Sequence, residues 1–438
     1  MDDPIRHPLA HARIERGWSQ EDLARQIRQA ALCRGLRSGV ARQRIWKWEN
    51  NRAVPDANSQ ALIAEVFEAD PSSVAALGWP DWLPGRDSSL PFSPHSAVLA
   101  LREALRTAMD RRTFLTYSST ALAGLAQQWA ATEPQTLAQA LDGRPVNAEL
   151  VDMLVNTGTK LTSLVTEQRQ HTRTLVDAHL ATVTDLIEGG NYAPAVGRRL
   201  HGLAASLSQT AGWHRFDQGK HAAASRFWRG ALHSAQASGD RDLGAGILSD
   251  LAYQATWLKE PKAAADVLEH AVDRTGHPAA RSLLSLRLAR AQAALGEAVA
   301  CRRSLSRAEA ELGSAAGSGS IPAWCSWMSP ADLLVDSGQC LLDLGAPERA
   351  HQLIDEGMRL LPAARDKTRA VFLTYEADGF LRAGEADHAA VAAKESLALA
   401  NRIGAPRCVA LVVGLLPEFQ RYAGVEGVAD LMELVRES

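Results

Sequence analysis

The sequence predicts an all-α protein in which a small five-helix domain precedes a long solenoid of helical hairpins. Three observations support this fold class. Of 438 residues, 46% are hydrophobic and 22% are charged, as in an ordinary globular protein. From Ala97 onward, apolar residues recur with the 3.6-residue period of helices and without a convincing period of two. Small residues also recur at fixed offsets between residues 200 and 405, which indicates repeated hairpins.

Changes in composition divide the chain into four parts. Residues 1–80 hold short helical patterns, and residues 81–96 (DWLPGRDSSLPFSPHS) are rich in Pro, Ser and Gly, as linkers are. We expect connecting helices over 97–199 and a repeat domain with a C-terminal capping helix over 200–438. No window reaches the roughly 18 consecutive apolar residues of a membrane helix, so we expect a cytoplasmic protein without a membrane partner.

The first helices are predicted by the segment PLAHARIERGWSQEDLARQIR (8–28). It gives a helix, a turn at Gly17 and a second helix. Ser19 suits the N-cap of the second helix, and Asp22 three residues later completes a loose capping box. Two further short helices, at about 58–67 and 71–77, supply apolar residues that close a small core.

The segment GVARQRIWKWENNRAVPD (39–56) predicts a helix with two different faces. The apolar face holds Val40, Ile45 and Trp48. Six basic residues and one acid lie between Arg34 and Arg52, although the formal net charge of the chain is −3. A helix that buries one face and offers long donors on the other suits the DNA major groove. The alternative is a solvated helix whose arginines only reflect base composition.

Residues 7–80 resemble the lambda-repressor/Cro-like (XRE) helix-turn-helix family, through RGWSQEDLA followed by VARQRIWKWENNRAVPD. The resemblance implies double-stranded DNA as partner, with an inverted-repeat operator bound by a homodimer. It implies that Gln20 binds a phosphate and that Arg13 and Glu49 form a buried structural ion pair. Base-reading roles are implied for Arg42, Gln43, Trp46 and Lys47. Phosphate contacts are implied for Arg44, Asn50 and Arg52.

Two features depart from the pattern of that family. The segment QAALCRGLRS (29–38) lengthens the connection between the second and third helices. Ala41 occupies a position usually held by Ser or Thr, which leaves Ser38 as the substitute N-cap. Trp46 is unusual on a face that points into a groove. It either contacts a thymine methyl group or packs against the inserted segment.

A pattern of small residues recurs five times in the C-terminal half. In the first copy, Gly219 is followed by Ala224, Trp228 and Ala231, and Gly212 stands seven residues earlier. The copies start at Gly219, Lys259, Gly296, Gly345 and Gly384. Small residues at fixed places on both helices of a hairpin allow close helix approach. Residues 200–405 resemble tetratricopeptide repeats, with a period of 37 to 49 residues instead of the usual ~34.

The resemblance to tetratricopeptide repeats implies a concave groove lined by the first helix of each hairpin. In that family the groove holds peptides or partner segments. The groove positions carried across the repeats are Trp213, Tyr253, Arg290, Gln339 and Asp378. Their mixed aromatic and polar character suits a peptide site. The alternative is that they are ordinary exposed residues of a scaffold.

The segment RRTFLTYSSTALAGLAQQWA (111–130) looks like a twin-arginine export signal, but 110 residues precede it. The first ten residues, MDDPIRHPLA, carry acids where a secretory leader is basic. We therefore expect a connecting helix and a candidate dimer contact, as in the actinobacterial helix-turn-helix regulators with tetratricopeptide C-termini that the whole chain resembles. An apolar seam that would pair with another helix is formed by Leu115, Ser118, Leu122, Leu125 and Trp129.

The sequence holds no motif for catalysis, a metal or a cofactor. HEXXH and GxSxG are absent, and the five cysteines contain no CxxC, so we expect buried reduced thiols. His214 and His221 are expected on helix surfaces. We predict a sequence-specific transcriptional regulator, not an enzyme, whose repeats sense a peptide, a small ligand or a protein partner. The alternative function is a tetratricopeptide scaffold or adaptor with a tethering DNA-binding domain.

Overall fold

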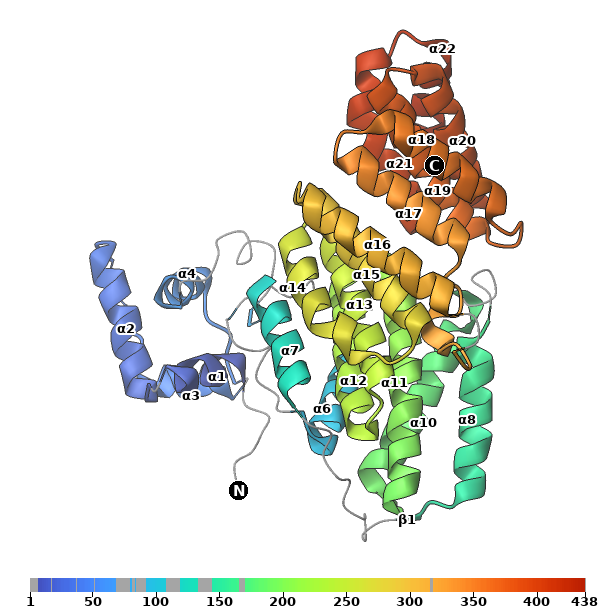
Figure 1. Ribbon diagram of the computed structural model, residues 1–438. Coiled ribbons are helices and arrows are strands. Elements are labelled where there is room, and N and C mark those ends of the chain that lie inside the picture. Colours follow the sequence, from blue (N-terminus) through green and yellow to red (C-terminus); the bar gives the residue numbers. More distant parts are fainter. Residues whose placement is uncertain are drawn as a thin grey trace.

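The fold is almost entirely helical, as the sequence predicts (Figure 1). The computed structural model describes residues 7–16, 18–36, 38–50, 52–67, 79–80, 83, 92–107, 119–132, 144–164, 170–315 and 318–437. Within these ranges the only sheet is a parallel pair of two-residue strands, β1 (Arg144–Pro145) and β2 (Gly190–Asn191). A membrane-spanning helix needs about 20 apolar residues, and no helix in the described ranges has such a stretch.

The N-terminal helices lie to one side of the other helices in Figure 1. They are α1 (Pro8–Glu15), α2 (Gln20–Cys33), α3 (Arg42–Glu49) and α4 (Ala57–Val66). Their shared core is apolar and almost completely buried, with Leu23, Ile27, Ile45, Trp48 and Ile63. The helix expected at 71–77 lies outside the described residues. These four helices therefore share one core of their own.

The ends of α2 and α3 show how local sequence sets their bounds. The Oγ atom of Ser19 accepts a hydrogen bond from the Asp22 backbone N–H (3.1 Å), and the Asp22 carboxylate accepts one from the Ser19 N–H (2.9 Å). The predicted capping box is thus confirmed. Part of the inserted segment extends α2 to Cys33, because Ala30 and Ala31 continue its buried face.

The expected N-cap at Ser38 is wrong. The N-cap residue of α3 is Ala41, which makes no side-chain hydrogen bond to the helix. The Ser38 hydroxyl instead accepts a hydrogen bond from the Val40 backbone N–H (3.4 Å). Ser38 stands three residues before the N-cap, so its side chain does not cap the first turn of α3.

The C-terminal half consists of six helical hairpins in a row. They are α11 (Pro194–Phe216) with α12 (His221–Ser238), α13 (Arg241–Trp257) with α14 (Pro261–Ala271), α15 (Pro278–Ala294) with α16 (Ala298–Ser314), α17 (Pro330–Asp343) with α18 (Pro347–Leu360), α19 (Asp366–Ala383) with α20 (Ala386–Arg402), and α21 (Pro406–Phe419) with α22 (Glu426–Glu437). The first helices of successive hairpins pack on one another. We call these the inner helices, and they make the expected helical-repeat fold.

Small residues of the repeats have two separate roles. The residue at the first position of each copy lies in the turn between the two helices of a hairpin. Its φ is positive, between 66° and 81°, a conformation that favours glycine. Lys259 is the only non-glycine residue with positive φ among the described residues. Seven residues earlier the inner helix approaches its partner closely. A Cβ atom on Gly338 would lie 2.6 Å from Ile354 Cγ1, and one on Gly212 would overlap the Trp228 indole. The fixed offsets therefore reflect turn geometry and close packing.

Four helices precede the hairpins: α6 (Pro94–Thr107), α7 (Ser119–Ala131), α8 (Ala148–Thr162) and α10 (Arg173–Gly189). α6 packs on α12, and α7 packs on α14, so both cover second helices of hairpins (Figure 1). Short 3₁₀ turns η1 (Gln170–Thr172), η2 (Val272–Arg274), η3 (Ala323–Cys325) and η4 (Gln420–Tyr422) complete the described elements.

The apolar seam of α7 pairs with helices of its own chain. Leu122, Leu125 and Trp129 are buried in the core that α13 and α14 share. The Trp129 indole Nε1 lies 2.8 Å from the position that a Cβ on Gly244 would occupy. Pairing with another helix is thus confirmed, but these three residues are not available to a second copy. Leu115 and Ser118 lie outside the described residues.

The long connection between α16 and α17 is packed against inner helices. It contains η3, which contacts α13 and α15. The ring of Trp324 lies against Gly246 of α13, where a Cβ atom would be 2.6 Å from Trp324 Cδ2. A glycine at this position therefore makes room for a tryptophan from a loop almost 80 residues later in the chain.

Candidate nucleic-acid interface and inner groove

The two faces of α3 differ as the sequence predicts. Val40, Ile45 and Trp48 are at most 3% exposed. On the opposite face, the predicted base-reading residues are all exposed, and half of the Trp46 surface (50%) is accessible. In the described ranges, no ion pair within 4 Å involves Arg42, Arg44 or Lys47. This face therefore presents unpaired long donors and one aromatic ring, which suits contact with phosphates and base edges.

A buried carboxylate fixes the end of α3 against α1 and α2. The Nε atom of Arg13 donates to Glu49 Oε1 (2.6 Å), and its Nη2 donates to Oε2 (3.3 Å). The ion pair implied by the family resemblance is thus confirmed. The Gln20 side-chain amide also donates to Glu49 Oε2 (2.6 Å), a contact that the sequence did not indicate. The side chain of Glu49 is 4% exposed, so its charge depends on these donors.

The predicted phosphate-side residues follow the end of α3. Asn50 is the C-cap of the helix, and its side-chain amide donates to the Trp46 carbonyl (2.8 Å). Arg52 is exposed, and its backbone N–H donates to the Lys47 carbonyl (2.8 Å). Arg44 lies near Asp56, where hydrogen bonds from the Ser59 backbone lower the pKa of the carboxyl and Arg44 adds to the effect. Arg44 and Arg52 thus remain accessible, whereas the Asn50 amide is engaged.

The five predicted groove residues lie on five successive inner helices, one on each, and none of them is exposed. Trp213, Tyr253, Arg290 and Asp378 are half-buried and Gln339 is buried, and their role as a peptide site stays a prediction. Neighbouring groove residues contact one another: the rings of Trp213 and Tyr253 are 5.8 Å apart, and Gln339 donates to Asp378 (3.4 Å). Arg290 lies over the ring of Tyr375 at 5.0 Å. Sequence offsets thus place all five residues on inner helices, where they are more buried than expected.

Asp250 connects three inner helices through one buried carboxylate. It accepts hydrogen bonds from Gln209 Nε2 (2.7 Å), Trp213 Nε1 (3.0 Å) and Arg287 Nη1 (3.0 Å). Burial raises the pKa of Asp250, and the positive charge of Arg287 opposes that shift. The sequence analysis missed Asp250, although it stands three residues before Tyr253, on the same helix face.

Arg290 is less well satisfied. Its guanidinium lies 3.8 Å from Asp336 and 3.9 Å from Asp343, and its Nη1 atom is buried without a hydrogen-bond partner. The Oε1 atom of Gln339 is likewise buried and unbonded. Burial raises the pKa of Asp336 to about 6. The inner helices therefore hold one buried donor and one buried acceptor that make no hydrogen bond.

The two ends of the groove face are joined by a contact that we call the clasp. Asp217, after α11, accepts a hydrogen bond from Arg407 Nε (3.1 Å) and pairs with Lys367. Arg407 Nη1 also donates to the Tyr253 hydroxyl (2.9 Å), and its guanidinium lies 5.4 Å from the Trp257 ring. The clasp thus connects the first two inner helices with α19 and α21. Its basic residues lie near the starts of those two helices, and no local pattern indicated them.

The histidines and cysteines partly depart from expectation. His214 is buried and His221 is half-buried, so the expected helix-surface positions are wrong for His214. All five cysteines are free; Cys33 is exposed, and the other four are buried. The buried reduced state expected for every thiol is therefore wrong for Cys33, which is the last residue of the α2 extension.

Comparison with known proteins gives a family model for the N-terminal part and several solved structures with a similar fold. The family model of the SP15 N-terminal domain matches residues 9–78. No curated protein matches the chain.

Among solved structures, the chain is similar to a Rap protein complexed with competence and sporulation factor, at 12% identity and a TM-score of 0.41, over 66% of this chain and 98% of that one. It is similar to BtubC from P. vanneervenii, at 15% identity and a TM-score of 0.38, over 55% and 93% of the two chains. It is also similar to aspartyl phosphate phosphatase F from Bacillus subtilis, at 12% identity and a TM-score of 0.37, over 67% and 86%.

Proposed function

We propose that this chain is a sequence-specific DNA-binding regulator of the cytoplasm, in which residues 1–80 bind operator DNA and residues 200–438 bind an effector. The single observation that carries the proposal is the exposed basic face of α3, which no ion pair with a described residue covers, opposite a buried apolar face. A helix in the major groove needs this division, because the protein side must pack while the DNA side supplies donors.

The proposed contacts follow from where the side chains lie. Arg42, Gln43, Trp46 and Lys47 would meet base edges, and Arg44 and Arg52 would meet phosphates. The Gln20 amide has two N–H groups, of which Glu49 takes one. The second can donate to a phosphate, so that one residue would position both α3 and the DNA backbone. A homodimer would place two such faces on the halves of an inverted repeat.

The groove is the proposed effector site. A peptide or partner segment offers both carbonyl oxygens and N–H groups, which would complement Arg290 Nη1 and Gln339 Oε1 if its binding uncovered these buried atoms. Trp213 and Tyr253 add an aromatic surface beside them. Binding at the groove would change the contacts between inner helices and thereby the placement of the DNA-binding domains.

The test is to incubate the purified full chain with fragmented DNA of its own genome near physiological salt and to sequence the retained DNA. The variant Arg42→Ala/Lys47→Ala tests the α3 face. Arg302→Ala/Arg436→Ala is the matched control, because it removes the same charge from exposed positions of the repeats. We expect the wild type and the control to enrich one inverted repeat, and the α3 variant to lose it.

Salt dependence separates the proposed function from the adaptor. The salt dependence reports phosphate contacts, so the slope of log K against log salt should fall by about 1.8 in Arg44→Ala/Arg52→Ala, which removes the two proposed phosphate partners. Weak binding without sequence preference, equal in variant and control, would reject the regulator and favour an adaptor that binds a protein through its repeats. If removal of residues 200–438 left operator affinity the same with and without effector, the coupling would be absent.

A further inference from the structure

A cavity of about 270 Å³ lies between α14, α15 and α16. Its lining includes apolar atoms of Val272, Leu288 and Ala300 and polar atoms of Ser285 and Gln292. It is smaller than the usual pockets for drug-sized ligands, which begin near 300 Å³, so it suits a small metabolite. The groove residues do not line it, so it is separate from the proposed effector site.

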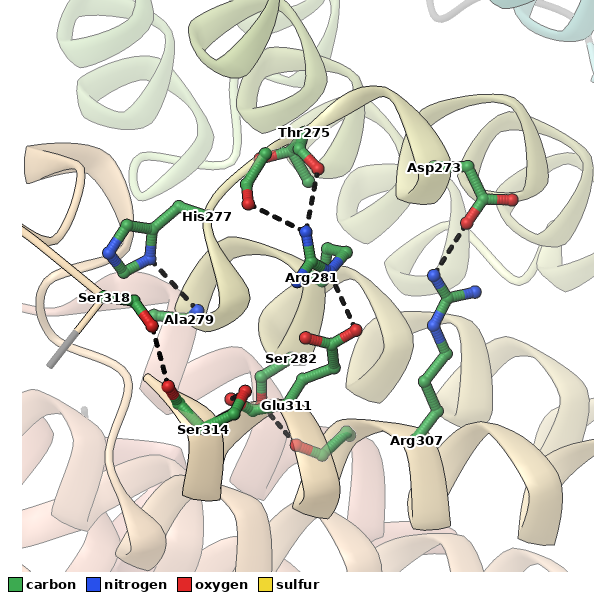
Figure 2. A network of polar contacts seen from close by, with 12 residues as sticks. Asp273, Thr275, His277, Ala279, Arg281, Ser282, Arg307, Glu311, Ser314 and Ser318 are labelled. Carbon is green, nitrogen blue, oxygen red and sulfur yellow. Dashed lines mark hydrogen bonds and ion pairs between the residues drawn. The ribbon is translucent and has the colours of Figure 1, made fainter. Parts of the chain in front are cut away.

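Two pairs of opposite charges line this cavity, one closed and one open. Arg307 of α16 donates to Asp273, after α14, at 2.6 Å (Figure 2). One turn earlier on each side stand Glu269 and Arg303, which also line the cavity. Among the described ion pairs, none joins these two side chains within 4 Å. The two sides of the cavity are therefore joined by the Asp273–Arg307 pair, whereas Glu269 and Arg303, one helical turn earlier, form no ion pair with each other.

One of the residues that line the cavity, Ser285, has a buried hydroxyl without a hydrogen-bond partner among the described residues. Ser285 is 1% exposed, and its Oγ atom makes no hydrogen bond. The neighbouring polar group is satisfied, since Ser304 Oγ donates to Gln292 Oε1 at 2.8 Å. Buried polar atoms in folded proteins are nearly always hydrogen-bonded, so an unbonded hydroxyl in a cavity wall indicates a missing acceptor.

We propose that this cavity binds a free α-amino acid. The carboxylate would accept hydrogen bonds from Arg303 and the Ser285 hydroxyl, and the ammonium group would pair with Glu269. The side chain would lie against Leu288 and Val272. Two acids and two bases line the cavity, so it favours a ligand that carries both charges over a net anion or cation.

The test measures binding of each of the twenty L-amino acids to the full chain by calorimetry, at concentrations up to about 10 mM. Any amino acid that binds is compared with the same molecule lacking its amine and the same molecule lacking its carboxylate. The variants are Arg303→Gln and Glu269→Gln, with Arg302→Gln and Glu309→Gln as controls. All four residues are exposed, and the control residues do not line the cavity. Thermal unfolding verifies that each variant folds.

We expect saturable binding of one or more amino acids, at least about tenfold weaker in either cavity variant and unchanged in the controls. The analogues lacking one charge should lose binding to a similar degree. The proposal is overturned if no amino acid saturates, or if the cavity variants bind as tightly as the controls. It is also overturned if the carboxylate lacking its amine binds equally well, since the site would then be a simple anion site.

Discussion

The exposed face of α3 and the inner helices of the repeats use the same charged residue types in opposite ways. On α3, Arg42 and Lys47 are exposed and form no ion pair with any residue that the structure describes. On the inner helices, Asp250 and Arg287 are almost completely buried and bonded to each other. An exposed charge costs little to keep and is free to meet a partner. A buried charge must be matched by its own chain, and removing its partner is costly.

Removal of the Asp250 carboxylate tests the buried side of this comparison most strongly. Asp250→Ala removes the acceptor of Gln209 and Trp213 and the buried carboxylate partner of Arg287, so we expect the free energy of unfolding to fall by about 3–5 kcal/mol. Urea denaturation measures the change. Arg42→Ala/Lys47→Ala should change stability by no more than about 0.5 kcal/mol. An equal effect of both variants would abolish the distinction between the two regions.

The variant Glu49→Ala tests whether the stability of the N-terminal helices also depends on one buried charge. The substitution leaves Arg13, whose side chain is 12% exposed, without its carboxylate partner. We expect the free energy of unfolding of α1–α3 to fall by about 3 kcal/mol. Hydrogen exchange of their amides measures this locally, because the repeats have their own cores. Glu21→Ala is the control, since its pair with Arg28 is exposed. Unchanged exchange in Glu49→Ala would mean that this ion pair does not hold α3.

Acid should destabilise the repeats through His233, which stacks on Phe92 with ring centroids 4.4 Å apart. Burial, with a smaller effect of Arg229, lowers its pKa to about 3. The unfolded chain therefore binds the proton first, and stability falls as the pH drops from about 6.5 toward 3. Protonation of His233 in the unfolded chain should lower the free energy of unfolding by about 2 kcal/mol between pH 8 and pH 5.

The variant His233→Phe keeps the stacked ring but cannot bind a proton. Between pH 8 and pH 5, we expect its free energy of unfolding to fall by about 2 kcal/mol less than that of the wild type. Denaturant titrations at pH 8 and pH 5 give the comparison, and His388→Phe, at an exposed position, should leave the pH dependence unchanged. An identical pH dependence in His233→Phe and wild type would rule out this histidine as the cause.

The smallest expected change in stability concerns the turn between α13 and α14, where backbone conformation and not charge is tested. Lys259 has a φ of 66° between α13 and α14, which costs about 1 kcal/mol for a residue with a Cβ atom. Lys259→Gly should therefore raise stability by up to about 1 kcal/mol, measured by thermal unfolding. Lys262→Gly removes a lysine from within α14 and should lower stability by a similar amount. A loss in both would show that the backbone at Lys259 is not strained.

Much of this architecture is local and could be predicted from sequence. The two faces of α3, the Ser19 cap and the hairpin turns at residues such as Gly219 depend on spacings within one or two turns of helix. The same offsets place one proposed groove residue on each of five inner helices. The clasp and the Asp250 contacts could not be predicted, because they join residues up to 190 positions apart. Burial of His214 likewise depends on neighbouring hairpins, which its own helix pattern does not encode.

The clasp between Asp217, Lys367 and Arg407 has a consequence for how the repeats unfold. In a linear array each hairpin contacts only its neighbours, so end hairpins can fray while the middle persists. Here the beginning and the end of the row are bonded to each other. Loss of either end breaks contacts at the other, so the hairpins should unfold in one cooperative transition. Folding should correspondingly be slow for an all-helical chain, because the clasp closes a loop of 150 residues or more.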